Sequence, residues 1–176
     1  IIRHATNIGA AANILRSFEV ASGPWLWILG DDDLLTTDAV SLALKAIKEH
    51  HGASFINFRT STMSLQGLRP KPFTTVGQAS FVYNHDYPGN VNFMSVGLWR
   101  VQTVLPSIHL AYHYAYSMSP TYVLLLSSLG ETGRCHFCSD VVIDTVATAE
   151  ISTKWHFSDF ILGWNTILEL PMSDNI

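Results

Sequence analysis

Charged side chains are scarce in this sequence. Only 14% of the 176 residues are Asp, Glu, Lys or Arg, whereas a soluble domain usually carries about 25%. The 10 basic residues are outnumbered by 14 acidic ones, which gives a formal net charge of -4. A protein that binds nucleic acid through a positive surface needs Lys and Arg to neutralise phosphates, so we expect no nucleic-acid partner. Intrinsic disorder is excluded as well, because 48% of the residues are hydrophobic.

Cysteine and long apolar runs are also lacking. Two cysteines cannot build a disulfide-rich scaffold, and no apolar run approaches the ~18 to 20 residues of a membrane-spanning helix. The length suits a single domain, and we expect residues 1–176 to form one. The chain starts with Ile1 rather than Met and shows no signal-peptide pattern. We therefore expect the N-terminal part of this domain to be missing.

The first third of the chain alternates helical and strand-like segments. Apolar residues at helical spacing predict helices over Ala10–Val20 and Ala39–His50. Short continuous apolar runs predict buried strands over Trp25–Leu29 and Ala53–Phe58. The apolar face of the second helix is formed by Val40, Leu44 and Ile47. The order helix, strand, helix, strand predicts a layered α/β fold.

The remaining segments are less regular. Val91–Val101 and Cys135–Thr145 are predicted as strands, and Tyr112–Leu129 as mostly helical. Ser158–Leu168 is predicted as a terminal helix. Met63–Gln78 contains two Pro and two Gly and has no clear period, so we expect a long loop, which in a compact domain usually serves function.

Three adjacent carboxylates, Asp31–Asp33, follow the apolar run Trp25–Leu29 after a single glycine. Open α/β sheets bind ligands at the carboxyl ends of their strands, and a cation would relieve the repulsion within the triplet. Carboxylate oxygens suit Mg²⁺ or Mn²⁺, which bind one or two carboxylates together with substrate phosphates. A solvated turn leading into a helix is the alternative. A phosphatase motif with an aspartyl nucleophile is another, although Leu35 stands where that motif has Thr.

Several short motifs follow one another in a fixed order. They are Asn7-Ile8-Gly9, the helical Asn13, Ala21-Ser22-Gly23-Pro24-Trp25-Leu26-Trp27 and Leu29-Gly30-Asp31-Asp32-Asp33-Leu34-Leu35. This set resembles family 2 glycosyltransferases, and is most similar to the branch that transfers sugars in bacterial surface-polysaccharide synthesis. The resemblance implies an A-type, Rossmann-like fold, in which a mixed, mainly parallel sheet is flanked by helices; its first strands would be missing here. Residues 1–60 would form the donor- and metal-binding part and residues 61–176 the acceptor-side part, where Ser95–Arg100 looks like the strand lining the acceptor.

The resemblance also implies the chemistry. A sugar would move from a nucleotide-diphosphate donor to a glycan or lipid-linked acceptor with inversion, and Mg²⁺ or Mn²⁺ would neutralise charge growing on the leaving diphosphate. By the family pattern, Asp33 would bind the metal, and Asp31 would face the ribose or the metal. The nucleotide side would be completed by Asp32, Asn7 and Asn13. The apolar excess would suit a cytoplasmic enzyme resting against the inner face of the membrane.

An inverting transfer needs a group that takes the proton of the acceptor hydroxyl. The family usually supplies an Asp after the acceptor-side strand, but no carboxylate stands between Asp86 and Glu131. That interval holds His109 and His113, which are chemically able to act as the base near neutral pH. Asp86 is the third candidate. Each has a structural alternative: the histidines as surface or core-edge side chains, and Asp86 as a turn residue before Pro.

Two later motifs have competing interpretations. His156 follows a Trp, and in some transferases of this fold a late His completes the metal shell; ordinary packing is the alternative. Cys135 and Cys138 form a C-x-x-C without a second ligand pair for zinc. In a strand their side chains would face opposite sides of the sheet, which favours two buried thiols over a metal or redox site.

Two other functions stay open. A degenerate transferase-like domain that has lost its base would serve as a binding or scaffold module, and the missing carboxylate is its main support. A metal-dependent phosphatase would instead form a phosphorylated Asp31 during turnover.

Overall fold

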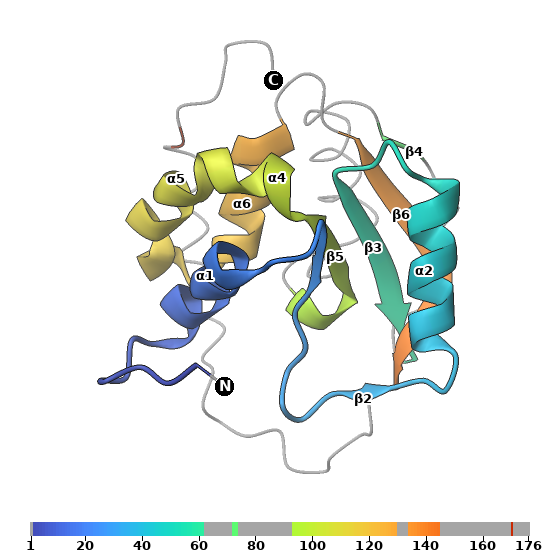
Figure 1. Cartoon of the computed structure of the whole chain (residues 1–176), viewed down its shortest axis with the longest axis horizontal. Coiled ribbons are helices and arrows are strands. Elements are labelled where there is room, and N and C mark those ends of the chain that lie inside the picture. Colours follow the sequence, from blue (N-terminus) through green and yellow to red (C-terminus); the bar gives the residue numbers. More distant parts are fainter. Residues whose placement is uncertain (1, 62–71, 74–92, 130–133, 145–169, 171–176) are drawn as a thin grey trace.

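The computed structural model describes residues 2–61, 72–73, 93–129, 134–144 and 170. In this part of the chain, a mixed sheet carries helices on both of its faces (Figure 1). The strands are β1 (Trp25–Trp27), β2 (Leu34–Leu35), β3 (Phe55–Thr60), β4 (Pro72–Phe73), β5 (Gly97–Arg100) and β6 (Cys135–Asp144). The α-helices are α1 (Ala10–Val20), α2 (Ala39–Glu49), α4 (Val101–Val104), α5 (Ile108–His113) and α6 (Pro120–Leu129). The 3₁₀ helices are η1 (Met94–Val96), η2 (Leu105–Ser107) and η3 (Ala115–Ser117).

The described strands are ordered β1-β5-β3-β6-β2, with β4 paired to β6. Strands β3 and β6 run parallel, whereas β5 is antiparallel to both β1 and β3, and β2 and β4 are antiparallel to β6. The predicted α/β class with a mixed sheet is confirmed. The expected majority of parallel pairs is not met among the described strands. Strands β1 and β3 point the same way, as consecutive strands of a βαβ unit do, but β5 lies between them and runs in the opposite direction.

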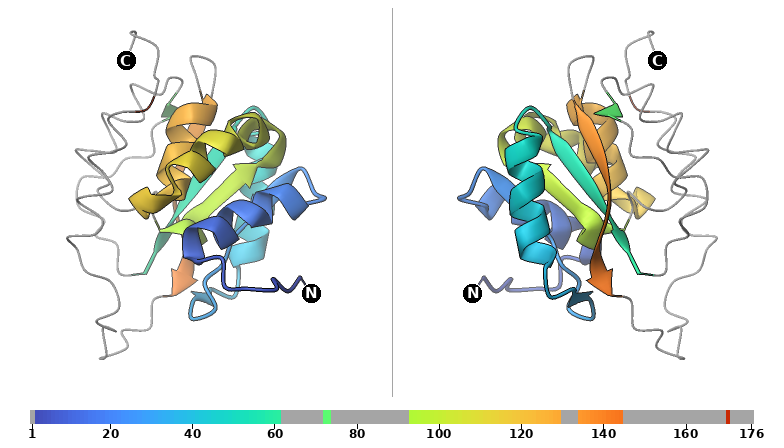
Figure 2. Two further views of the ribbon diagram at one scale, coloured as in Figure 1. Left: turned by 90° about the vertical axis from the view of Figure 1, so that its left-hand side faces the viewer. Right: turned by 90° about the vertical axis from the view of Figure 1, so that its right-hand side faces the viewer.

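Successive residues of β3 and β5 alternate between two cores, because side chains in a strand point to opposite faces. On one face, Phe55 and Trp99 are buried with residues of α1, α4, α5 and α6. On the other face, Ile56 and Leu98 are buried with residues of α2. The ring of Trp99 lies 4.3 Å from that of Phe55 and 5.7 Å from that of Phe18 on α1, measured between centroids. The two views of Figure 2 show these two helical layers, one on each side of the sheet.

Both early helices are confirmed, since α1 spans the predicted range and α2 ends at Glu49. The predicted apolar face of α2 is wrong. Val40 and Leu44 are 58% and 62% exposed, and Ile47 is partly buried. The buried positions of α2 are Ala39, Ala43 and Ala46. Both sets recur at helical spacing, and the smaller side chains allow the helix to pack more closely on the sheet.

The strands differ from their predictions in burial and length. Strand β1 is shorter than the predicted Trp25–Leu29, and its half-buried residues lie at the edge of the described sheet rather than between two strands. Strand β3 is buried throughout, as expected, and extends to Thr60. In the predicted strand Val91–Val101, the described part begins with the 3₁₀ helix η1 and only Gly97–Arg100 is extended. Strand β6 confirms the strand predicted over Cys135–Thr145.

The predicted helix over Tyr112–Leu129 is interrupted. Helix α5 ends at His113, and Met118 adopts a left-handed conformation with φ 60° before α6 begins. Proline at the first position of α6 fits there because its missing N–H has no partner in a first turn. The predicted loop Met63–Gln78 lies outside the described residues, except for the two that form β4. The predicted helix Ser158–Leu168 also lies outside them.

None of the helices that the structure describes is both long enough and apolar enough to cross a membrane.

The two cysteines face opposite sides of the sheet, as predicted. Cys135 is buried in the core beneath α6, and Cys138 in the core beneath α2. Both thiols are free. Burial raises the pKa of Cys135 far above its usual range, and burial together with the charge of Asp140 raises the pKa of Cys138 to about 12. The C-x-x-C is therefore two structural thiols of the core.

These raised pKa values predict unreactive thiols in the folded protein. The thiolate is the reactive form, and at pH 8 both side chains stay protonated because that pH lies well below either pKa. We expect no labelling by dithionitrobenzoate within minutes at pH 8, and complete labelling of both thiols after unfolding in guanidinium chloride. Rapid labelling of either thiol in the native protein would contradict the placement of these side chains.

Candidate functional site

The acidic triplet lies in the turn that follows β1 and leads to β2 (Figure 1). Asp31 and Asp32 are exposed, whereas Asp33 is half-buried. The Gly30 amide donates a hydrogen bond to Asp33 Oδ2 at 3.2 Å, and the Asp33 amide donates to the Gly30 carbonyl at 3.4 Å. The turn therefore closes on itself, and Asp33 is the carboxylate of the triplet that points toward the protein.

Ser95 of η1 holds this turn against the sheet. Its side chain is fully buried, and its hydroxyl donates a hydrogen bond to Asp33 Oδ2. The same hydroxyl oxygen accepts the Gly30 amide at 3.0 Å. The Ser95 carbonyl accepts the indole N–H of Trp27 at 2.8 Å. Strand β1 and the turn after it are thus bonded to η1 through one residue.

A glycine is required at the start of the turn. A Cβ at position 30 would lie 2.6 Å from Asp33 Oδ2, closer than real Cβ atoms come to another atom, and 3.0 Å from Asp32 Oδ1, which is a tight contact. The Asp33 carboxylate, while it is bonded to Ser95, therefore occupies the space that a side chain at position 30 would need.

Two adjoining hollows open along the N-terminal segment and α1. The smaller, of about 260 Å³, is lined by residues of the N-terminal segment and α1 and by Leu29 and Met94. Those two residues directly precede Gly30 and Ser95, so the hollow ends next to the bonded turn, although no residue of the acidic triplet lines it. The larger, of about 490 Å³, is lined by residues 4–10 and Asn13. His4 and Asn13 line both.

The two asparagines predicted on the nucleotide side lie at these hollows. Asn7 Oδ1 accepts the Gly9 amide at 2.9 Å, and Gly9 has φ +79°, a conformation that side-chain-bearing residues rarely adopt. The Asn13 amide donates to the Gly9 carbonyl and begins the helical bonding of α1. The structure thus places Asn13 at both hollows, while Asn7 shapes the approach to α1.

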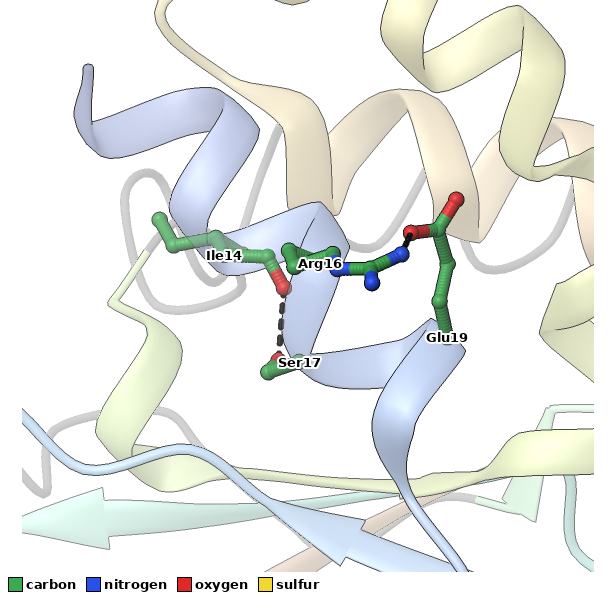
Figure 3. A network of polar contacts seen from close by, with 4 residues as sticks. All are labelled: Ile14, Arg16, Ser17 and Glu19. Atoms are coloured by element: carbon green, nitrogen blue, oxygen red, sulfur yellow. Dashed lines mark hydrogen bonds and ion pairs between the residues drawn. The ribbon is translucent and has the colours of Figure 1, made fainter. Parts of the chain in front are cut away.

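The wall of the smaller hollow contains an ion pair that was not predicted (Figure 3). Arg16 Nη1 lies 2.5 Å from Glu19 Oε2, and this hydrogen bond and the charge of Glu19 raise the pKa of Arg16. Ser17 Oγ donates to the Ile14 carbonyl at 2.6 Å. On the neighbouring α5, burial and then the charge of Glu19 raise the pKa of Tyr112. The positive charge of Arg16 at this wall is therefore paired with Glu19.

The two candidate histidines are not brought to this site. Both are exposed residues of α5. His109 Nδ1 lies 3.1 Å from the Pro106 carbonyl, and His113 packs edge-on against Tyr114 at 4.9 Å between ring centroids. Neither lines the two hollows, and α5 lies away from the turn after β1 in Figures 1 and 2. Their role as catalytic base stays a prediction that this placement does not favour.

The acidic turn offers ligands for a hard divalent cation. Asp33 Oδ2 is occupied by two donors, and we find no hydrogen bond to Oδ1 among the described residues. Within the described ranges, no three or more His, Cys, Asp or Glu side chains form a group that could hold a metal ion. Mg²⁺ and Mn²⁺ take one or two carboxylates and complete their shell with water and phosphate oxygens, so metal binding by Asp31 and Asp33 stays a prediction. Two further candidates, Asp86 and His156, lie outside the described residues.

Sequence reasoning missed the partners of Asp33. Ser95 was expected on the acceptor-side strand, and Gly30 only as the end of a strand. The hydrogen bond between Ser95 and Asp33 joins residues 62 positions apart, and no local pattern connects them. The antiparallel register of β1 and β5 would have been the signal, and it requires knowing that β5 inserts beside β1.

The close contact at position 30 predicts a specific sensitivity. Gly30→Ala forces the Asp33 carboxylate away from Ser95, and we expect the free energy of unfolding to fall by about 1–3 kcal/mol, the cost of losing hydrogen bonds to a charged group. Gly23→Ala is the matched control, because its Cβ would meet nothing closer than a carbonyl oxygen at 3.5 Å. Urea unfolding compares the two. Equal stabilities would be inconsistent with the carboxylate position.

Three comparisons with known proteins bear on this geometry. The family described as Glycosyl transferase family 2 matches residues 1–97, which contain both the acidic turn and Ser95. Among solved structures, the crystal structure of S. aureus TarS 1-349 is similar, with a TM-score of 0.59 and 14% sequence identity. The similarity covers 93% of this chain and 45% of the TarS chain, so this chain spans less than half of that protein's length. No curated protein matches the sequence.

The two matches agree with each other. The likeness to TarS shows the mixed α/β fold, and the family match extends over more than half of the 176 residues. The chain belongs to glycosyl transferase family 2.

Proposed function

We propose that the protein transfers a sugar from a nucleotide-diphosphate donor to a glycan or lipid-linked acceptor, with inversion at the anomeric carbon. One observation carries this proposal: the Asp33 carboxylate is fixed by Gly30 and Ser95 beside a hollow that Asn13 lines. Family membership supplies the class of chemistry. A carboxylate held in place beside a cavity can hold a cation next to a bound diphosphate.

We assign to the site residues the roles that the family resemblance implies. Asp33, with Asp31, would bind Mg²⁺ or Mn²⁺, and the exposed Asp32 would face the nucleotide. Such a cation, when bound, neutralises charge that develops on the leaving nucleoside diphosphate. Asn13 would contact the nucleotide in the smaller hollow, and Asn7 would hold the approach to α1 in shape.

On the acceptor side, the proposal needs a base and a surface that meets the acceptor. His109, His113 and Asp86 stay candidates for the base that takes the acceptor proton. The exposed apolar side chains of α2 and β2 would suit contact with a membrane surface at the cytoplasmic face. These side chains are Leu34, Leu35, Val40 and Leu44.

Removing the Asp33 charge tests the proposal. In the intact protein, we expect Asp33→Asn to weaken Mn²⁺ binding by at least about 100-fold, because even residues that only orient a ligand contribute 10–100-fold. Release of nucleoside diphosphate from a panel of nucleotide sugars should fall in parallel. Mn²⁺ affinity is measured by electron paramagnetic resonance of the free ion, and product release by chromatography.

Asp140→Asn is the matched control, because it removes the same charge from an exposed position on β6. An Asp33→Asn protein that binds Mn²⁺ and releases product like the wild type would overturn the assignment. Nucleotide binding without release from any donor would favour a binding module. A trapped phosphoryl group on Asp31 would favour a phosphatase.

A further inference from the structure

Ser95 is placed opposite the acidic turn by strand register. Strands β1 and β5 pair antiparallel with Trp25 opposite Arg100 and Trp27 opposite Leu98. Continuing this register beyond the last pair brings Gly30 opposite Ser95. The chain turns into η1 at this point, so backbone pairing stops, and the Ser95 hydroxyl accepts the Gly30 amide in its place at 3.0 Å.

The Ser95 hydroxyl uses its donor hydrogen and one of its two acceptor lone pairs within the acidic turn. A serine hydroxyl has one donor and two acceptor lone pairs. The donor goes to Asp33 Oδ2, and one lone pair takes the Gly30 amide. The Gly30 amide also lies 3.2 Å from Asp33 Oδ2. The three groups thus form a closed cycle in which the position of each one fixes the other two.

The two oxygens of the Asp33 carboxylate differ in their hydrogen bonds. Asp33 Oδ2 receives both donors, and no described residue bonds Oδ1. Because Ser95 is fully buried, water cannot replace its hydroxyl as a donor without entering the core. Hydrogen-bonding partners that orient a ligating carboxylate commonly control metal affinity in this way.

We propose that Ser95 is a positioning residue for the donor site: its hydroxyl fixes the Asp33 carboxylate so that Oδ1 faces the bound cation and diphosphate. The proposal rests on the function proposed for Asp33. It extends that function to the acceptor-side segment, because Ser95 lies in the turn that leads directly into β5. Met94, the preceding residue, lines the smaller hollow, so a displacement of Ser95 would also move part of the wall of that hollow.

The test measures Mn²⁺ affinity of the intact protein, without donor and without turnover, by electron paramagnetic resonance. We expect Ser95→Ala to weaken binding by about 10- to 100-fold, the range found for residues that orient metal ligands. Ser95→Cys keeps nearly the same volume but offers only a weak donor, so it should show a similar loss. In turnover, the Mn²⁺ concentration for half-maximal rate should rise, while kcat at saturating Mn²⁺ stays within a few-fold of wild type.

Ser117→Ala is the matched control. Ser117 is also fully buried, and its hydroxyl accepts the Ser119 amide at 3.3 Å, but it lies in η3 and not at the acidic turn. Removing it should lower thermal stability less than Ser95→Ala, because only one hydrogen bond to an uncharged group is lost, and should leave Mn²⁺ affinity unchanged. A merely structural role for Ser95 would leave the Mn²⁺ affinity of both variants unchanged.

The outcomes separate the two proposals. If Asp33→Asn loses Mn²⁺ and both Ser95 variants bind it as tightly as wild type, Ser95 is not a positioning residue and the proposed function stands. If the wild type itself does not bind Mn²⁺, with or without a nucleoside diphosphate, the role proposed for Asp33 fails, and the role of Ser95 fails with it.

Discussion

The insertion of β5 between β1 and β3 is the constraint on which the site depends. Strand β5 pairs antiparallel with both neighbours, so its direction decides what lies opposite the end of β1. Because β5 runs in this direction, Ser95 of η1 lies against the turn after β1. At the other end of the pair, the Arg100 guanidinium lies 4.9 Å from the centre of the Trp25 ring at the start of β1, a cation–π contact. A parallel β5 would put a different segment of the chain beside Asp33.

The two cores keep that strand in place. Trp99 and Leu98 of β5 lie in different cores, so a shift by one residue would exchange their environments and bury each side chain in the wrong space. The contacts of Trp99 with Phe55 and Phe18 join β5 to β3 and α1. Because α1 also carries Asn13, the same packing sets the distance between the hollow and the acidic turn.

Local features of the fold could be predicted from the sequence, and features that depend on pairing could not. Helix α1 follows from its apolar spacing, and the buried strand β3 follows from its apolar run. The buried face of α2 was missed because alanines and larger apolar residues both recur at helical spacing, and only the sheet decides which set it accommodates. The insertion of β5 was missed because strand order is set by contacts between distant segments.

The residues of the candidate site also separate into those that a local motif predicts and those that depend on strand pairing. Asp33 and Asn13 were predicted as site residues because their motifs are contiguous in sequence, and the structure places Asn13 at the hollow that ends next to the acidic turn. Ser95 was not assigned a role there, since its bond to Asp33 spans the insertion of β5. His109 and His113 were chosen because they stand in the part of the sequence where the family has its base, and the fold carries that part away from the acidic turn on α5.

The central claim is that a bonded, preorganised Asp33 is the metal ligand of the donor site. The most direct measurement is an anomalous difference map from crystals of the intact protein grown with Mn²⁺ and a nucleoside diphosphate. The account predicts a manganese peak at coordination distance from Asp33 Oδ1, with the Ser95 hydroxyl still bonded to Oδ2. A peak bound elsewhere, or an Asp33 carboxylate turned away from Ser95 in the bound state, would contradict it.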